Sequence, residues 1–154
     1  MRRSEREIKD LQEIKSIIEE CKVMRIALKD DEGLYIVPVN FGYAYKNNKF
    51  EFYFHSSKKG RKIEALRLNP GVAFEMDCEH ELVVADIACN YSYHFASVMG
   101  CGSVTFLEGQ EKLDSLSALM KHQTNQDFEF DERVAKSVEV CKITASELSV
   151  KANR

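Results

Sequence analysis

The sequence lacks the short motifs that mark the commonest catalytic and nucleotide-binding sites. It contains no GxSxG, no Walker loop, no HExxH and no GxGxxG, so none of the site types that these motifs define is indicated. The run Gly100-Cys101-Gly102 is too short for a nucleotide fingerprint. In a long strand, such glycines are typical of a bend or a bulge.

Paired cysteines and a secretory leader are also missing. The five cysteines are an odd number without a CxxC pair, and the first ten residues are too charged for the apolar core of a signal peptide. We therefore expect reduced thiols and a cytoplasmic protein. Cys78, His80, Cys89 and His94 have spacings that match no familiar zinc finger or ribbon, and we assign no metal site.

An excess of positive charge is absent as well. Lys and Arg number 22 against 25 Asp and Glu, which gives a net charge of −3, whereas a general nucleic-acid binder needs a basic excess. The run 87–107 has no charged residue over 21 positions, but eight of these are Asn, Ser, His, Thr or Gly. That composition is too polar for a membrane span. We predict neither a nucleic acid nor a membrane as a partner.

The patterns that are present indicate a mainly β protein. The 154 residues, of which 44% are hydrophobic, predict a single domain over residues 1–154. Ser4 and Glu7 fit a capping box at the start of an N-terminal helix within residues 1–22, which we expect to pack on the sheet. Short strands follow, with helices over about 58–68 and 110–122. This succession predicts an antiparallel β-barrel with flanking helices, in which closure removes the exposed edges.

The most distinctive segment runs from an aromatic strand into a helix start. It reads Phe54-His55-Ser56-Ser57-Lys58-Lys59-Gly60-Arg61-Lys62, and four of its last five residues are cationic. A helix N-terminus already carries positive partial charge and free amides, so cations there are unfavourable. A bound anion, most naturally a phosphate, would resolve this conflict. The alternative is a solvated basic turn that only improves solubility.

Two further residues allow more than one interpretation. Pro38 interrupts Ile36–Phe41, which otherwise resembles a buried strand. Because proline cannot donate to a sheet, this segment is either an edge strand or a stretch of main chain that lies along a planar ligand. His55 ends its strand beside the proposed anion site, and is either a ligand-facing group or an ordinary exposed histidine.

Several runs of the sequence occur together in a recognisable order and spacing. They are Met24–Leu28, the turn at Gly33, Val37-Pro38-Val39-Asn40-Phe41-Gly42-Tyr43, Phe52–Ser57, Gly60-Arg61-Lys62, Asn69-Pro70, Ser97-Val98-Met99-Gly100-Cys101-Gly102 and Leu119-Met120-Lys121-His122. In this combination the chain resembles the flavin-binding split barrels related to pyridoxamine 5′-phosphate oxidase. It is most similar to their nitroimidazole-resistance (Nim-like) branch, and the resemblance covers almost the whole chain.

The resemblance implies an antiparallel split β-barrel of the FMN-binding type that forms a homodimer, with two FMN molecules at the subunit interface. The cofactor-binding residues that it implies are Val37, Pro38, Val39, Asn40, His55, Ser56, Ser57, Arg61, Lys62 and Ser97. Among these, Arg61 and Lys62 would grip the flavin phosphate, and the main chain of residues 37–40 would run beside the isoalloxazine ring. Ser97 stands where the oxidases proper carry a Gln that touches the cofactor.

The resemblance also implies a function. The chain has no Trp and ends without the Arg-Leu-x-Pro segment of true pyridoxamine-phosphate oxidases, so vitamin B6 oxidation is not expected. We expect an FMN-dependent oxidoreductase that reduces a small acceptor such as a nitro-aromatic or a quinone. His55 would be the catalytic residue, donating a proton or a hydrogen bond to the substrate. The alternative is a non-catalytic protein that stores flavin or binds haem.

Overall fold

Seven antiparallel strands form one sheet in the computed structural model, which describes residues 3–154. The strands are β1 (Val23–Asp30), β2 (Gly33–Asn40), β3 (Gly42–Lys46), β4 (Lys49–Ser56), β5 (Gly71–Val83), β6 (Ser92–Phe106) and β7 (Glu139–Asn153). The helices are α1 (Leu11–Glu20), α2 (Arg61–Leu68), α3 (Gly109–Thr124) and α4 (Glu132–Ala135), with short 3-10 turns η1 (Ser4–Arg6) and η2 (Ala88–Asn90). The predicted mainly β class with flanking helices is confirmed.

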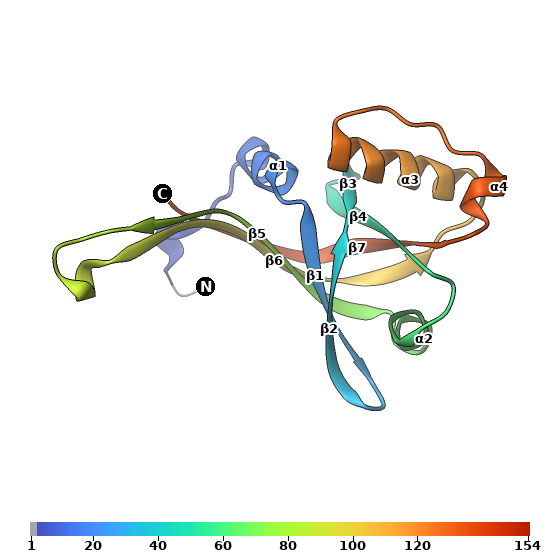
Figure 1. Cartoon of the computed structure of the whole chain (residues 1–154), viewed down its shortest axis with the longest axis horizontal. Coiled ribbons are helices and arrows are strands. Elements are labelled where there is room, and N and C mark those ends of the chain that lie inside the picture. Colours follow the sequence, from blue (N-terminus) through green and yellow to red (C-terminus); the bar gives the residue numbers. More distant parts are fainter. Residues whose placement is uncertain (1–2) are drawn as a thin grey trace.

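The sheet curls strongly but does not close. Its strand order is β2-β1-β5-β6-β7-β4-β3, so β2 and β3 are the two edges. Nevertheless β2 lies against β4, near the opposite end of the sheet, as Figure 1 shows. The fold is therefore a split barrel, as predicted. The expectation that closure removes the edges is wrong, because among residues 3–154 no ladder of hydrogen bonds joins β2 to β3.

The aromatic strand β4 supplies the centre of the hydrophobic core. Phe50, Phe52 and Phe54 are buried on one face of the strand, as the alternation of the sequence predicts. The ring of Phe52 packs against Phe41 and Phe74, with centroids 5.9 and 5.1 Å away. These contacts anchor β4 and so set the position of the segment that follows it.

The N-terminal helix begins later than predicted. Ser4–Arg6 forms a single 3-10 turn, and Glu7 is extended and bridges to Lys151 of β7. Helix α1 begins at Leu11, where the Asp10 carboxylate accepts a hydrogen bond from the N–H of Glu13. The predicted capping box at Ser4 is wrong, because the main chain at Glu7 joins the sheet instead of a helix. Residues 1 and 2 of the predicted segment lie outside the described residues.

The helices cover different parts of the curled sheet. Helix α3 lies over β3 and β4, α2 packs beside β1, and α1 crosses β5 and β6 (Figure 1). Helices α2 and α3 correspond to the two helices expected over 58–68 and 110–122. None of the helices formed by residues 3–154 combines the length and hydrophobicity needed to cross a bilayer.

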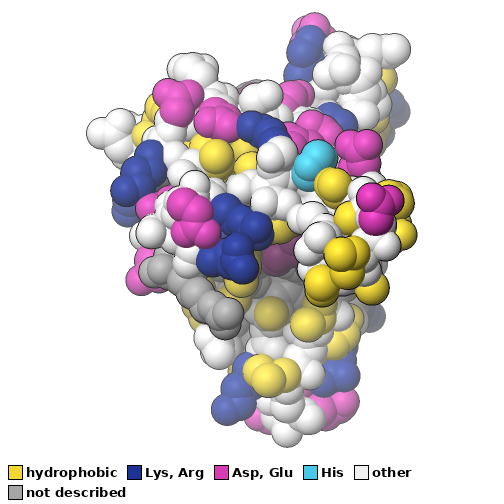
Figure 2. Space-filling model, turned by 90° about the vertical axis from the view of Figure 1, so that its left-hand side faces the viewer, with side chains coloured by type: hydrophobic (Ala, Val, Ile, Leu, Met, Phe, Trp, Pro, Cys, Tyr) yellow, Lys and Arg dark blue, Asp and Glu magenta, His cyan; other side chains and the backbone are white. Residues whose placement is uncertain are grey.

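Strands β5 and β6 extend together beyond the rest of the sheet and form an arm, which carries η2 at its tip (Figure 1). Figure 2 views the molecule from the side to which this arm projects, and hydrophobic side chains are prominent on that face. Exposed hydrophobic residues of the arm are Leu82, Val84, Ile87, Tyr91 and Tyr93. The pairing of β6 with β7 shifts register at Cys101 and Gly102, which confirms the predicted bulge.

Candidate functional site

The junction between β4 and α2 holds the segment that the sequence singles out. Ser56 ends β4 opposite Glu139 of β7, and the Ser57 hydroxyl donates to the Lys59 carbonyl oxygen at 2.7 Å, which tightens the turn. Gly60 precedes the helix with a φ of 127°, in the region that favours glycine. No side chain caps the first turn of α2, so its first N–H groups point toward the turn without a side-chain acceptor.

Lys62 is a partly buried cation that has no carboxylate partner among the described residues. Its Nζ lies 5.6 Å from the centroid of the Phe54 ring, and none of the ion pairs found within residues 3–154 includes it. Burial lowers the pKa of the Lys62 amine, because the charged form loses hydration that no carboxylate replaces. A bound anion would compensate this cost.

Arg61 has a different environment, although it is the adjacent residue. Its Nε and Nη2 donate to the two carboxylate oxygens of Asp30 at 2.6 and 3.0 Å, and Nη1 lies 3.3 Å from Glu32. The guanidinium also lies over the Tyr35 ring, 4.5 Å from its centroid. Arg61 therefore ties α2 to the β1–β2 hairpin, and its charge is already compensated.

The segment 37–40 lies on β2, which is an edge strand, and Pro38 is opposite Arg25 of β1. The edge-strand interpretation of Pro38 is thus confirmed, since one side of β2 needs no ladder donor. Val37 is partly buried and Val39 is buried. The Asn40 side chain donates to the Lys22 carbonyl oxygen and to Gln123 Oε1, both at 3.2 Å. Because the Asn40 amide is engaged, main-chain groups of β2 remain the candidates for contacting a ligand.

His55 lies on the face of β4 opposite Phe54 and is exposed. It lines a cavity of about 180 Å³ between β4, α3 and α4. The other lining residues are Leu116, Leu119, Met120, Phe130, Val134, Ser137 and Val138. The cavity is apolar apart from His55 and Ser137, so it suits a flat apolar molecule that offers one polar group to the imidazole.

Ser97 is not brought to the β4–α2 junction by the pairing of the sheet. It lies on β6 opposite Asp77 of β5 and Lys151 of β7, and β7 separates β6 from β4. Strand β2, which carries residues 37–40, contacts β4, which ends at His55 and Ser56, and Arg61 lies over the Tyr35 ring of β2. Strand β6, which carries Ser97, is two strands away from β4.

The cysteines are a further group of candidate ligands. All five are free thiols, and burial raises the pKa of Cys78 to about 11. Donor atoms of Glu20, Cys78 and Glu79 lie within 4.8 Å of one another, but the Glu79 carboxylate is held by two nitrogens of Arg154 at 2.8 and 2.7 Å. Because Arg154 already neutralises Glu79, we assign no metal to this group.

Sequence reasoning missed a second group of cations. Lys58 belongs to the basic segment, but its side chain lines a cavity of about 340 Å³ together with Lys112 and Lys136. The basic run was the only available signal for it, because Lys112 and Lys136 come from α3 and from the end of α4, far along the chain.

The residues present fit the predicted FMN. Lys62 offers an uncompensated positive charge, the uncapped first turn of α2 offers N–H groups, and the hydroxyl of Ser56 lies in the same segment, whereas the Ser57 hydroxyl already donates its hydrogen to the Lys59 carbonyl oxygen. These are the donors that a phosphate monoester needs. Strand β2 is an edge of the sheet, so its outer main-chain groups are available to a planar ring system.

Comparison with known proteins gives one family match. Residues 10–152 match the family model described as pyridoxamine 5′-phosphate oxidase. No curated protein matches the chain in sequence.

Solved structures share the fold. A candidate 5-nitroimidazole antibiotic resistance protein from Bacteroides thetaiotaomicron is 33% identical, with a TM-score of 0.78 over 96% of this chain and 90% of that one. The flavocytochrome Anf3 from Azotobacter vinelandii is 18% identical, with a TM-score of 0.78 over 100% and 72% of the two chains. An FAD and heme binding protein from Mycobacterium smegmatis is 16% identical, with a TM-score of 0.81 over 97% and 74%.

Proposed function

Because this chain belongs to the pyridoxamine 5′-phosphate oxidase family, we propose that it is an FMN-binding oxidoreductase that reduces a small acceptor through the bound flavin. The observation that carries this proposal is Lys62, a partly buried ammonium group without a carboxylate partner at the start of α2. The cost of burying this positive charge is not compensated unless an anion binds there.

The proposed roles follow from where the residues lie. Lys62 and the first N–H groups of α2 hold the phosphate, the Ser56 hydroxyl adds a hydrogen bond, and Ser57 shapes the turn through its bond to the Lys59 carbonyl oxygen. Main-chain groups of residues 37–40 bind the edge of the ring. When bound, the flavin supplies the electron transfer, while the protein supplies binding and orientation.

His55 is the proposed proton donor. It is exposed on β4, one residue from the phosphate-binding segment, and its imidazole faces the apolar cavity of about 180 Å³. A substrate ring in that cavity would present its polar group to His55. Histidine is the side chain that most often acts as a general acid in enzymes.

The substrate that we propose is a small aromatic acceptor such as a nitro-aromatic or a quinone. Two observations support it: the lining of the cavity beside His55 is largely apolar, and a 33% identical protein is described as a candidate 5-nitroimidazole antibiotic resistance protein.

We further propose that the functional unit is a homodimer with FMN at the interface. The exposed arm supports this, because Leu82, Val84 and Ile87 are 56, 70 and 60% exposed, and clustered exposed apolar side chains are typical of protein interfaces. Sedimentation should show a dimer, and Val84→Asp combined with Leu82→Glu should shift it to monomer. A monomeric parent protein would contradict the proposal.

A second candidate is a non-catalytic protein that binds flavin or haem. It is supported by the shared fold with a flavocytochrome and with an FAD and heme binding protein. A Soret band in place of a flavin spectrum would favour haem. Bound flavin that NADH or NADPH plus an acceptor cannot cycle would favour storage.

The test of the main proposal is a titration of the purified protein with FMN, followed by turnover with NADH or NADPH and a nitro-aromatic or quinone. We expect saturable FMN binding, and we expect Lys62→Ala to weaken it by about 1.5–3 kcal/mol, the range for a hydrogen bond to a charged group. Lys59→Ala is the matched control, since Lys59 is exposed in the same segment. Equal FMN affinity in Lys62→Ala and the parent would contradict the proposed phosphate site.

A further inference from the structure

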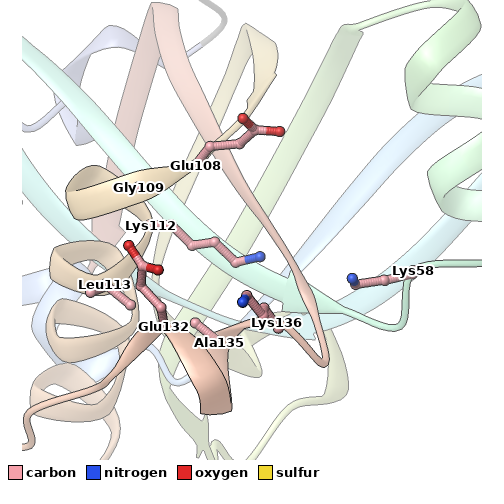
Figure 3. A pocket seen from close by; sticks show the side chains of 8 residues that line it. All are labelled: Lys58, Glu108, Gly109, Lys112, Leu113, Glu132, Ala135 and Lys136. Carbon is pink, nitrogen blue, oxygen red and sulfur yellow. The ribbon is translucent and has the colours of Figure 1, made fainter.

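The cavity of about 340 Å³ lies between α3, α4 and the loop that joins β4 to α2. Figure 3 shows Lys58 extending toward this hollow from the loop and Lys112 approaching it from α3, with Lys136 below Lys112 in the view. Three ammonium groups from three separate parts of the chain therefore converge on one space.

None of these three lysines forms an ion pair with a carboxylate within residues 3–154. The Lys112 Nζ donates to the Val138 carbonyl oxygen at 2.7 Å, which fixes its direction and leaves its charge uncompensated. Two carboxylates, Glu108 and Glu132, also line the cavity, and in Figure 3 the Glu108 carboxylate points away from the ammonium groups. Three positive and two negative groups give the lining a net charge of +1.

We propose that this cavity binds the phosphate group of a small phosphorylated molecule, at a site separate from Lys62. Like charges that converge repel one another, and a dianion between them reverses the sign of that interaction. Lysine suits such a ligand because it binds phosphate as a point charge without a fixed hydrogen-bonding plane. The cavity of about 340 Å³ is larger than a phosphate group, so another part of the ligand can enter it as well.

The cations of the basic segment thus lie in three different environments. Arg61 binds Asp30, Lys62 lies over Phe54, and Lys58 enters the cavity beside α3 and α4. The site at Lys58 and Lys136 needs no flavin, so it does not rest on the proposed function.

Isothermal titration of the full chain with inorganic pyrophosphate tests the proposal. The Lys62→Ala protein is used as the background, because it removes the other predicted phosphate site. We expect one saturable site in this background. Lys58→Ala or Lys136→Ala, added to it, should weaken binding about tenfold each, the scale of one charge-assisted hydrogen bond. Both lysines are exposed, so these variants should fold, which circular dichroism verifies.

Lys59→Ala in the same background is the matched control and should leave pyrophosphate binding unchanged. Loss of all pyrophosphate binding in Lys62→Ala would overturn the proposal. A pyrophosphate affinity in either the Lys58→Ala or the Lys136→Ala protein equal to that of the Lys62→Ala background would overturn it too. If Lys136→Ala instead abolishes FMN binding, the cavity belongs to the flavin site and the separate site does not exist. A failure of FMN binding in the parent protein, with pyrophosphate binding intact, would reject only the flavin function.

Discussion

The carboxylate of Asp30 holds the guanidinium of Arg61 by two hydrogen bonds, with 2.6 Å between Nε and Oδ2 and 3.0 Å between Nη2 and Oδ1. This pair joins the first turn of α2 to the turn between β1 and β2, across 31 positions of sequence. The Arg61 guanidinium lowers the pKa of the Asp30 carboxyl. The pair positions the β4–α2 junction against β2, while the neighbouring Lys62 stays without a carboxylate.

We expect Arg61→Ala to affect FMN binding less than Lys62→Ala does. The Arg61 charge is compensated by Asp30 and Glu32, so its removal costs the phosphate little direct attraction. The measurement is the FMN dissociation constant of both variants. A larger loss of FMN affinity in Arg61→Ala than in Lys62→Ala would mean that Arg61 leaves Asp30 and binds the phosphate itself.

His55→Ala should retain FMN and slow the reduction of the acceptor. The imidazole is exposed beside the apolar cavity, and no hydrogen bond or ion pair within residues 3–154 includes it. Removing a general acid typically costs about 10²- to 10⁴-fold in rate. Steady-state kinetics with the flavin-loaded protein measure it, and His94→Ala on the arm, where His94 faces Glu81, serves as the control. Unchanged rates in His55→Ala would remove this residue from the mechanism.

The stability of the protein should fall as the pH drops below about 6.5 because of His122. This histidine is buried, its Nε2 donates to the Cys21 carbonyl oxygen at 2.8 Å, and its Nδ1 has no hydrogen-bond partner. Burial lowers its pKa, although Glu19 lies 3.5 Å from Nδ1. Below pH 6.5 the unfolded chain takes up a proton that the folded protein does not bind. The free energy of unfolding should therefore decrease by up to about 1.4 kcal/mol per pH unit, until the folded-state pKa is reached.

Urea denaturation at pH 7.5 and pH 5.5 measures this effect. In His122→Gln, the part of the pH dependence that comes from the imidazole should disappear, whatever the variant's overall stability. The same pH dependence in the parent and in His122→Gln would show that other groups cause it.

Gly100→Ala should destabilise the sheet by about 1–3 kcal/mol or more. A Cβ at this position of β6 would collide with the Glu147 carbonyl oxygen and lie 2.5 Å from Cζ of Phe74. Gly71→Ala is the control, since its Cβ would meet only the Asn69 side chain, at 3.3 Å. Thermal unfolding gives the melting temperatures of the two variants. Equal values would contradict the close approach of Glu147 and Phe74 to Gly100.

Local patterns of the sequence determined much of the fold. The alternation of Phe50, Phe52 and Phe54 predicts the buried face of β4. The pair Asn47-Asn48 is typical of the tight turn that joins β3 to β4, where both residues have positive φ. These predictions succeeded because side-chain alternation and turn chemistry depend on neighbouring residues. The helix start at Ser4 failed, because the main chain at Glu7 pairs with a strand from the other end of the chain.

Local sequence is enough to place the cations at the start of α2 and Pro38 within a strand. The role of each cation depends on residues that are distant in sequence and meet only in the folded chain. Successive helix residues point about 100° apart, so Arg61 meets the carboxylate of Asp30 while Lys62 lies over the Phe54 ring. Asp30, Lys112 and Lys136 reach this region through strand order and helix packing. Such long-range placement depends on how the sheet curls, which no local pattern of residues encodes.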